Sequence, residues 1–158
     1  MKTKCLKAVC LLLASLAGGS AWAQVKVEGG WARATVQGQK ATGAFMKLTA
    51  DKSLRLVSVS SPAAGVAEIH EMKMEGNVMK MRALPVLELP AQQTVELKPG
   101  GHHLMLMDLK TPLMKDSSVS LTLTFRDASG LETRQQLSLP VTSGMPQGQM
   151  PSHASHKH

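Results

Sequence analysis

The sequence is poor in aromatic residues and in cysteine. Its 158 residues include two Phe, two Trp and no Tyr, and the two cysteines are Cys5 and Cys10. So few aromatic side chains offer little surface on which nucleic-acid bases could stack. The basic residues form no cluster either, so nucleic acid is not expected as a partner. What the chain does have is eleven methionines, which either pack a core or hold a metal.

The first 23 residues have the pattern of a secretory signal. Lysines stand at the start, an apolar run follows from Ala8 to Ala17, and Ala21 and Ala23 form a small-x-small cleavage site. We expect cleavage before Gln24 and a periplasmic location for the mature chain. The apolar run is shorter than the roughly 20 residues that span a bilayer, so no membrane anchor is expected.

Both cysteines lie inside this signal, and neither is next to the cleavage site, which argues against lipid attachment. The mature chain therefore has no thiol. This excludes an electron-transfer cupredoxin, which binds copper through a Cys thiolate beside two His. A copper monooxygenase with an N-terminal histidine is not expected either, because Gln24 stands at the cleavage point. We expect a protein that is not an enzyme.

The remaining chain has the pattern of one all-β domain, which we place at residues 24–142. Short alternating or apolar runs recur between turn signals such as Ser61-Pro62 and Asp127–Gly130, and no segment has a long helical period. This spacing predicts an antiparallel β-sandwich or barrel. The runs expected to be strands are GAFMKLTA, LRLVSVS, VAEIHEMKM, VMKMRAL, TVELKPG, HHLMLMDLK, VSLTLTFRD and TRQQLSLPV.

The composition changes near the end, and residues 143–158 are expected to form a disordered tail. The segment SGMPQGQMPSHASHKH has no branched aliphatic or aromatic side chain, so burial cannot offset the entropy of ordering it. His-rich tracts bind metals, and imidazole suits Cu(II), so the tail is a candidate second, Cu(II)-preferring site. The alternative is a solvated tail with incidental histidines. The candidate ligands are Met145, Met150, His153, His156 and His158.

The hairpin near residue 75 suggests a further group of soft ligands. If Glu75-Gly76 is a two-residue loop, His70 lies opposite Met81, and Met72 lies opposite Met79. Side chains alternate along a strand, so both pairs then share one face. Opposed residues have Cβ atoms about 5 Å apart, a distance that suits joint binding of one ion.

The stretch GGHHLMLMDLK adds histidine and methionine in a strand pattern. Here His103, Met105 and Met107 project to one face, whereas Leu104 and Leu106 project to the other together with His102 and Asp108. A methionine in a strand is more often a packing residue than a ligand. For His102 we expect a solvent-exposed or supporting role. Packing is the expected role of Met46, Met72, Met79, Met107 and Met114.

The spacing His70-x10-Met81-x21-His103-x-Met105 resembles that of the PCuAC family of periplasmic copper chaperones. The segments IHEMKMEGNVMKMR, LPAQQTVELKPGGHHLMLMDLKTPL and VSLTLTF extend the resemblance over nearly all of residues 25–142. Some family members carry Met directly after the first His, whereas this chain has Glu71 there. A ligand from that optional position is therefore excluded.

The resemblance implies a cupredoxin-like β-sandwich that binds one Cu(I) at an exposed site, with His70, Met81, His103 and Met105 as ligands. The chemistry agrees, because soft thioethers suit Cu(I) and imidazole also suits copper. The implied role is copper delivery to the CuA centre of cytochrome c oxidase subunit II, alongside Sco-type thiol proteins. The alternatives are a periplasmic copper buffer or resistance protein without a dedicated recipient, and an adhesive sandwich with accidental methionines.

Overall fold

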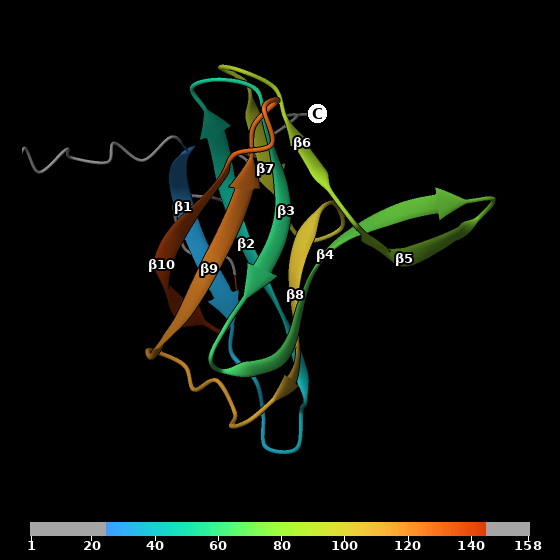
Figure 1. Ribbon diagram of the computed structural model, residues 1–158. Coiled ribbons are helices and arrows are strands. Elements are labelled where there is room, and N and C mark those ends of the chain that lie inside the picture. The colour runs from blue at the N-terminus through green and yellow to red at the C-terminus, as the bar shows by residue number, and fades with distance from the viewer. Residues whose placement is uncertain (1–24, 145–158) are drawn as a thin grey trace, which may run out of the picture.

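A computed structural model describes residues 25–144, and these residues form strands and loops without a helix. The prediction of an all-β fold is confirmed. None of the described residues form a helix that is long and apolar enough to cross a membrane. The ten strands are β1 (Val25–Arg33), β2 (Ala41–Ala50), β3 (Leu54–Ser60), β4 (Ala64–Glu75), β5 (Val78–Leu84), β6 (Leu87–Leu89), β7 (Thr94–Leu97), β8 (His103–Leu109), β9 (Ser118–Arg126) and β10 (Glu132–Thr142) (Figure 1).

The strands form two layers. One layer follows the order β5-β4-β8-β2-β1, with β7 also paired to β2, and the other follows β10-β9-β3-β6. The layers join where β1 pairs with β10, and this pair is parallel, whereas every other pair of described strands is antiparallel. The antiparallel prediction is thus wrong at this one pair. β1 and β10 are far apart in the chain, so no hairpin sets their relative direction.

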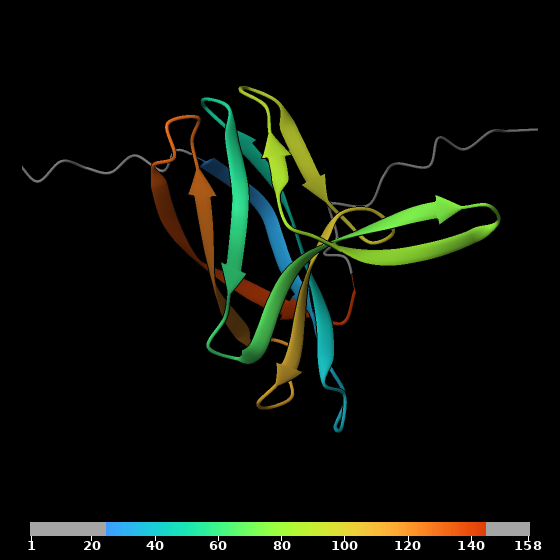
Figure 2. The same cartoon turned by 45° about the vertical axis from the view of Figure 1, so that its right-hand side comes forward.

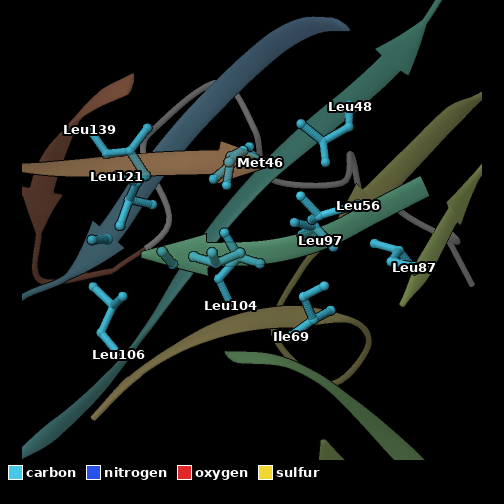
Figure 3. Packing of buried hydrophobic residues seen from close by; sticks show 14 of the residues in the cluster. Met46, Leu48, Leu56, Ile69, Leu87, Leu97, Leu104, Leu106, Leu121 and Leu139 are labelled. Atoms are coloured by element: carbon cyan, nitrogen blue, oxygen red, sulfur yellow. The ribbon is translucent and has the colours of Figure 1, made fainter. Parts of the chain in front are cut away.

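Leucines from both layers fill the core. In β9, Val119, Leu121 and Leu123 are buried and alternate with exposed Ser118 and Ser120, which is the period-two pattern of a half-buried strand. Figure 3 shows leucines of several strands packed between the layers, including Leu104 and Leu106 of β8. Fully burying one such side chain contributes roughly 1.5–3 kcal/mol. The core therefore fixes the inner face of β8 and leaves its other face available for a site.

Eight of the ten strands correspond to runs expected from the sequence. The two that were missed are β1 and β6. The sequence of β1 contains Gly29-Gly30, and its pairing with β2 is interrupted by a bulge between Glu28 and Trp31, which hides the alternation. The other, β6, has only three residues and is too short to show a period.

The loop of the β4–β5 hairpin lies one residue later than expected. Glu75 pairs with Val78, so the two loop residues are Gly76 and Asn77, and the predicted Glu75-Gly76 loop is wrong. Gly76 has φ 62°, and a type II′ turn requires a residue with positive φ, normally glycine, at this first position. The Gly-Asn dipeptide was the signal that could have found this loop.

Beyond the sandwich, the hairpin projects as a two-stranded ribbon. β8 pairs with β4 only from Ala64 to His70, and the rest of β4 pairs with β5 alone. We call residues 71–82 the ribbon. In both views it extends away from the two layers (Figures 1 and 2). A backbone hydrogen bond of 3.2 Å from Met72 N–H to the carbonyl of Gly101 ties its base to the loop before β8.

Candidate metal centre

His103 is held with one ring nitrogen fixed and the other free. Its Nδ1 is 3.0 Å from the carbonyl oxygen of Gly101, which can only accept, so Nδ1 donates the proton. The neutral ring then has its lone pair on Nε2, which lies 3.3 Å from Sδ of Met81. Burial lowers the pKa of His103, the hydrogen bond to Gly101 acts in the opposite direction, and the nearby His70 and His102 lower the pKa further. The ring is thus favoured in the neutral form that binds a metal.

His70 shows a complementary arrangement. It is 8% exposed, and its Nε2 lies 2.8 Å from a carboxylate oxygen of Glu68. Because an ionised carboxylate only accepts, Nε2 donates, and in the neutral ring Nδ1 then carries the lone pair. That Nδ1 is buried and has no hydrogen-bond partner among the described residues. Leaving such a group unsatisfied costs about 1–3 kcal/mol, and a bound metal ion would satisfy it.

Glu68 is a residue that the sequence reasoning missed. Carboxylates that accept a hydrogen bond from a metal-binding histidine fix its tautomer and raise its basicity. Glu68 could have been found from its position two residues before His70, because residues two apart on a strand share a face. Glu68 also lies directly opposite Met105 on β8.

The four predicted ligands come from three neighbouring strands. His70 of β4 lies opposite His103 of β8, and the two ring centroids are 5.8 Å apart. Met81 reaches His103 from β5, although β4 lies between the two strands. Met81, His103 and Met105 line one pocket of about 320 Å³, which Met72 also lines. The structure therefore brings three predicted ligands to one pocket and places the fourth, His70, beside His103.

The predicted pairing across the hairpin is wrong, although the predicted face is right. His70 lies opposite Ala83, not Met81, and Met72 lies opposite Met81, not Met79. Moving the loop by one residue shifts every pair by two positions. A shift by two leaves each side chain on its original face, so Met81 still faces the histidine side of the sheet.

An aromatic ring, that of Phe45, lines part of the pocket. Phe45 lines the pocket and packs against Trp31 with ring centroids 4.6 Å apart, and its ring is 6.4 Å from that of His103. Gly43 makes room for this ring, since a Cβ there would lie 2.8 Å from it. The guanidinium of Arg33 is 5.8 Å from the centre of the Phe45 ring. None of these residues was expected at the site from the sequence.

The methionines expected to pack fall into different environments. Met46 is buried in the core as expected, and Met107 is half-buried. Met72 lines the pocket, whereas Met79 and Met114 are exposed, so burial is not found for them. The tail candidates lie outside the described residues: Met145, Met150, His153, His156 and His158.

His102 and Asp108 were both expected on the face opposite His103, Met105 and Met107. His102 Nε2 lies 3.7 Å from a carboxylate oxygen of Glu71. The position after His70 thus points away from the predicted ligands. Asp108 departs from the expected alternation, because its φ of 53° lets Asp108 face solvent while Leu109 turns into the core.

The chemistry of the donor set favours a soft ion. Within residues 25–144, no three His, Cys, Asp or Glu side chains gather as a possible metal site. A site that the described residues form at the pocket therefore depends on thioether sulfur, which suits Cu(I) rather than Zn²⁺ or Ca²⁺. The residues present fit Cu(I).

Comparison with known proteins identifies the family. Residues 25–137 match the LpqE-like family, described as "Putative lipoprotein LpqE-like". The chain belongs to this family. A curated relative, "Putative lipoprotein Lxx21020" of Leifsonia xyli subsp. xyli (strain CTCB07), is 35% identical over 106 residues, which are 66% of this chain. The chain spans 64% of the length of that relative.

Solved structures share the fold of this LpqE-like chain. The copper-bound PCuAC domain from PmoF2 has a TM-score of 0.61 at 22% identity, covering 77% of this chain and 95% of the domain. The solution structure of CuI-DR1885 from Deinococcus radiodurans has a TM-score of 0.59 at 30% identity, covering 84% of this chain and 87% of that one. The first protein holds copper and the second holds Cu(I). The resemblance to PCuAC proteins inferred from the sequence is confirmed.

Proposed function

We propose that this chain is an extracytoplasmic copper carrier that binds Cu(I) through His70, Met81, His103 and Met105. The observation that carries the proposal is the His103 ring, whose Nδ1 is fixed by Gly101 while Nε2 lies 3.3 Å from the Met81 sulfur. The orphaned Nδ1 of His70 supports it independently. Two imidazole nitrogens and two thioethers form a neutral, soft donor set that matches Cu(I).

Location and ligand type agree with each other. The predicted signal at residues 1–23 and the lipoprotein description of the family support a site outside the cytoplasm. In oxidising compartments thiols form disulfides, whereas thioethers and imidazoles do not. A carrier built from methionine and histidine does not lose its ligands to disulfide formation. Such a carrier needs no catalytic group of its own.

The site is built for release as well as binding. Met81 is 49% exposed, and the pocket that it lines opens to the surface. A recipient protein therefore has access to the thioether side of the ion. The recipient that we propose is the CuA centre of cytochrome c oxidase subunit II, with a Sco-type thiol protein as a partner. The alternative is a copper buffer that holds the metal without a dedicated recipient.

Anaerobic titration with Cu(I), combined with X-ray absorption, tests the site. One equivalent should bind with mixed sulfur and nitrogen coordination. Met81→Leu and Met105→Leu each change side-chain volume little and should weaken this binding while the fold is kept. Met114→Leu, which removes an exposed methionine elsewhere on the surface, is the matched control. Unchanged affinity in both site variants would overturn the assignment.

A cellular experiment separates the carrier from the buffer. Deleting the protein at limiting copper should lower copper loading of the oxidase CuA centre, and added copper should restore it. A buffer predicts normal oxidase assembly at limiting copper and greater sensitivity to excess copper.

The tail adds a second proposal, a Cu(II)-preferring site formed by His153, His156 and His158 with help from Met145 and Met150. Imidazole is a good ligand for Cu(II), and a tethered tail reaches the sheet site at high effective concentration. Truncation after Thr142 should leave a folded domain that binds one Cu(I) at the histidine site and should remove Cu(II) binding. Undiminished Cu(II) binding after truncation would leave the tail as a solvated extension.

A further inference from the structure

The two faces of the ribbon carry different side chains. One face presents methionines in two opposed pairs, with Met74 opposite Met79 and Met72 opposite Met81. The other face carries charged residues, including the ion pair of Lys80 with Glu75 at 2.8 Å. Glu71 pairs with Arg82 on this charged face as well, and Lys73 and Lys80 are opposed there. The methionines are thus separated from charge by the sheet itself.

Packing does not account for these methionines. Met74, Met79 and Met81 are 58%, 44% and 49% exposed. A two-stranded ribbon in water gains little from exposed apolar side chains, and polar residues would serve as well at these positions. Buried Met46 in β2 shows where this chain does use methionine for packing. The exposed methionines of the ribbon therefore require another explanation.

The spacing of the sulfur-bearing side chains suits a small soft ion. Directly opposed residues of an antiparallel pair have Cβ atoms about 4.5–5.5 Å apart, and diagonal neighbours about 7–8 Å. Methionine has three rotatable bonds, so thioethers at these positions can converge on one point. Met74 and Met79 are the opposed pair near the tip of the ribbon, and Met72 is the diagonal neighbour of Met79 toward its base, so the three form such a group.

The methionine face of the ribbon runs directly into the pocket. Met72 and Met81 line the pocket together with His103, and Met74 and Met79 form the next pair outward along the same face. An ion at the outer pair therefore lies next to the thioethers that border the histidines. No charged side chain of the ribbon shares this face, so nothing on the ribbon repels a cation along it.

We propose that Met72, Met74 and Met79 form a second Cu(I) site made only of thioethers, through which Cu(I) enters and leaves the histidine site. The transfer is a ligand exchange, in which Met81 sulfur and then His103 Nε2 replace the outer thioethers. The ion stays Cu(I), and no electron or proton moves, because thioethers carry no proton to lose. The second site can exist whether or not the histidine site binds copper. Its role in loading rests on the proposed function of the histidine site.

The test compares the full chain with the double variant Met74→Leu/Met79→Leu. Both positions are exposed, so the substitution should leave the fold intact, which far-UV circular dichroism checks. The matched control is Met114→Leu, because Met114 is 65% exposed and lies outside the ribbon. Cu(I) stoichiometry is measured anaerobically by competition with bicinchoninate, and loading is followed by stopped-flow mixing with the Cu(I)–bicinchoninate complex.

We expect the double variant to lose one equivalent of weakly bound Cu(I) and to load the histidine site more slowly, by about tenfold, because an intramolecular hand-over benefits from high effective concentration. The coordination of the first equivalent should not change. Met114→Leu should behave as the unaltered chain. Unchanged stoichiometry and loading in the double variant would overturn the proposal. A change in sulfur and nitrogen coordination of the first equivalent would also overturn it, since the ribbon methionines would then belong to the histidine site.

A second arm separates this proposal from the proposed function. His103→Gln removes a nitrogen ligand from the histidine site, and His70→Gln serves the same purpose if that variant does not fold. With the ribbon intact, either variant should retain Cu(I) with sulfur-rich coordination by X-ray absorption. If the unaltered chain lacks mixed sulfur and nitrogen coordination but retains the sulfur-only ion, the histidine site fails and the ribbon site stands. If ribbon variants bind copper normally but no longer associate with a copper-receiving protein, the ribbon is a docking face and the metal site is wrong.

Discussion

Methionine has one role in the sandwich and another in the ribbon. Met46 in the sandwich is 2% exposed, because the second layer covers it, whereas Met79 in the ribbon is 44% exposed. A single strand, β4, passes from one environment to the other, from buried Ile69 to exposed Met74. Methionine is thus a packing residue where a second layer lies above it and an available thioether where none does.

The candidate site lies where these two regions meet. His70 and His103 are buried at the edge of the sandwich, and hydrogen bonds to Glu68 and Gly101 fix their rings. Met81 comes from the exposed ribbon. In the proposed site, two nitrogen donors held by hydrogen bonds and one exposed sulfur donor would bind the ion and leave one side of it open. This division of roles suits a carrier.

The largest expected effect is on the free energy of unfolding, when a core side chain of the sandwich is truncated. Leu104→Ala removes a fully buried core side chain on the face of β8 opposite His103 and Met105, and it should lower the free energy of unfolding by about 2–5 kcal/mol. Met79→Ala in the ribbon should change it by no more than about 0.5 kcal/mol. Urea unfolding of the copper-free chain measures both. Equal effects would show that the ribbon packs as tightly as the core.

Cu(I) affinity should be most sensitive to substitutions where the ribbon meets the sandwich. Met81→Leu should lower Cu(I) affinity by about 10- to 100-fold, since replacing even a supporting residue of a metal site has effects of this size. This corresponds to roughly 1.4–2.7 kcal/mol of binding free energy. Competition with a chromophoric Cu(I) chelator gives the value, and Met114→Leu should leave it unchanged. The unfolding free energy of the copper-free chain should stay the same in both variants.

Substitution of Glu68 tests whether its hydrogen bond to His70 supports copper binding. Glu68→Gln keeps the shape of the side chain but removes the charge that orients His70, and we expect Cu(I) affinity to fall by about tenfold. Glu88→Gln, at an exposed position in β6, is the matched control. A loss that is equal in both variants would indicate a general effect of charge and no specific support of His70.

The smallest expected effect is on the pH dependence of stability. Burial lowers the pKa of His103 below its ordinary value of 6.5, so the unfolded chain binds a proton at pH values where the folded chain does not. Stability should therefore decrease as the pH falls from 6.5 towards the folded pKa and should be fully present above 6.5. Urea unfolding of the copper-free chain at about pH 5 and pH 7.5 measures this difference. In the His103→Gln variant, the contribution of this imidazole to the pH dependence of stability should disappear.

Much of the fold could be predicted from the sequence because strand alternation is local. The runs that became β2, β8 and β9 alternate clearly and were expected. β1 was missed because a bulge breaks its period, and the parallel pairing of β1 with β10 was missed because it joins distant parts of the chain. The hairpin register was wrong because it depends on which two residues form the turn.

For the site, the sequence determined the face and the tertiary structure determined the partners. Period two together with a two-residue loop places Met72, Met74, Met79 and Met81 on one side of the hairpin, and moving this loop by one residue does not change the face. The opposition of His70 to His103 needed the pairing of β4 with β8, and the orphaned nitrogen of His70 needed the contact with Glu68. Alternation follows from the geometry of each strand by itself, whereas register, burial and hydrogen-bond partners depend on which strands lie side by side and which faces the second layer covers.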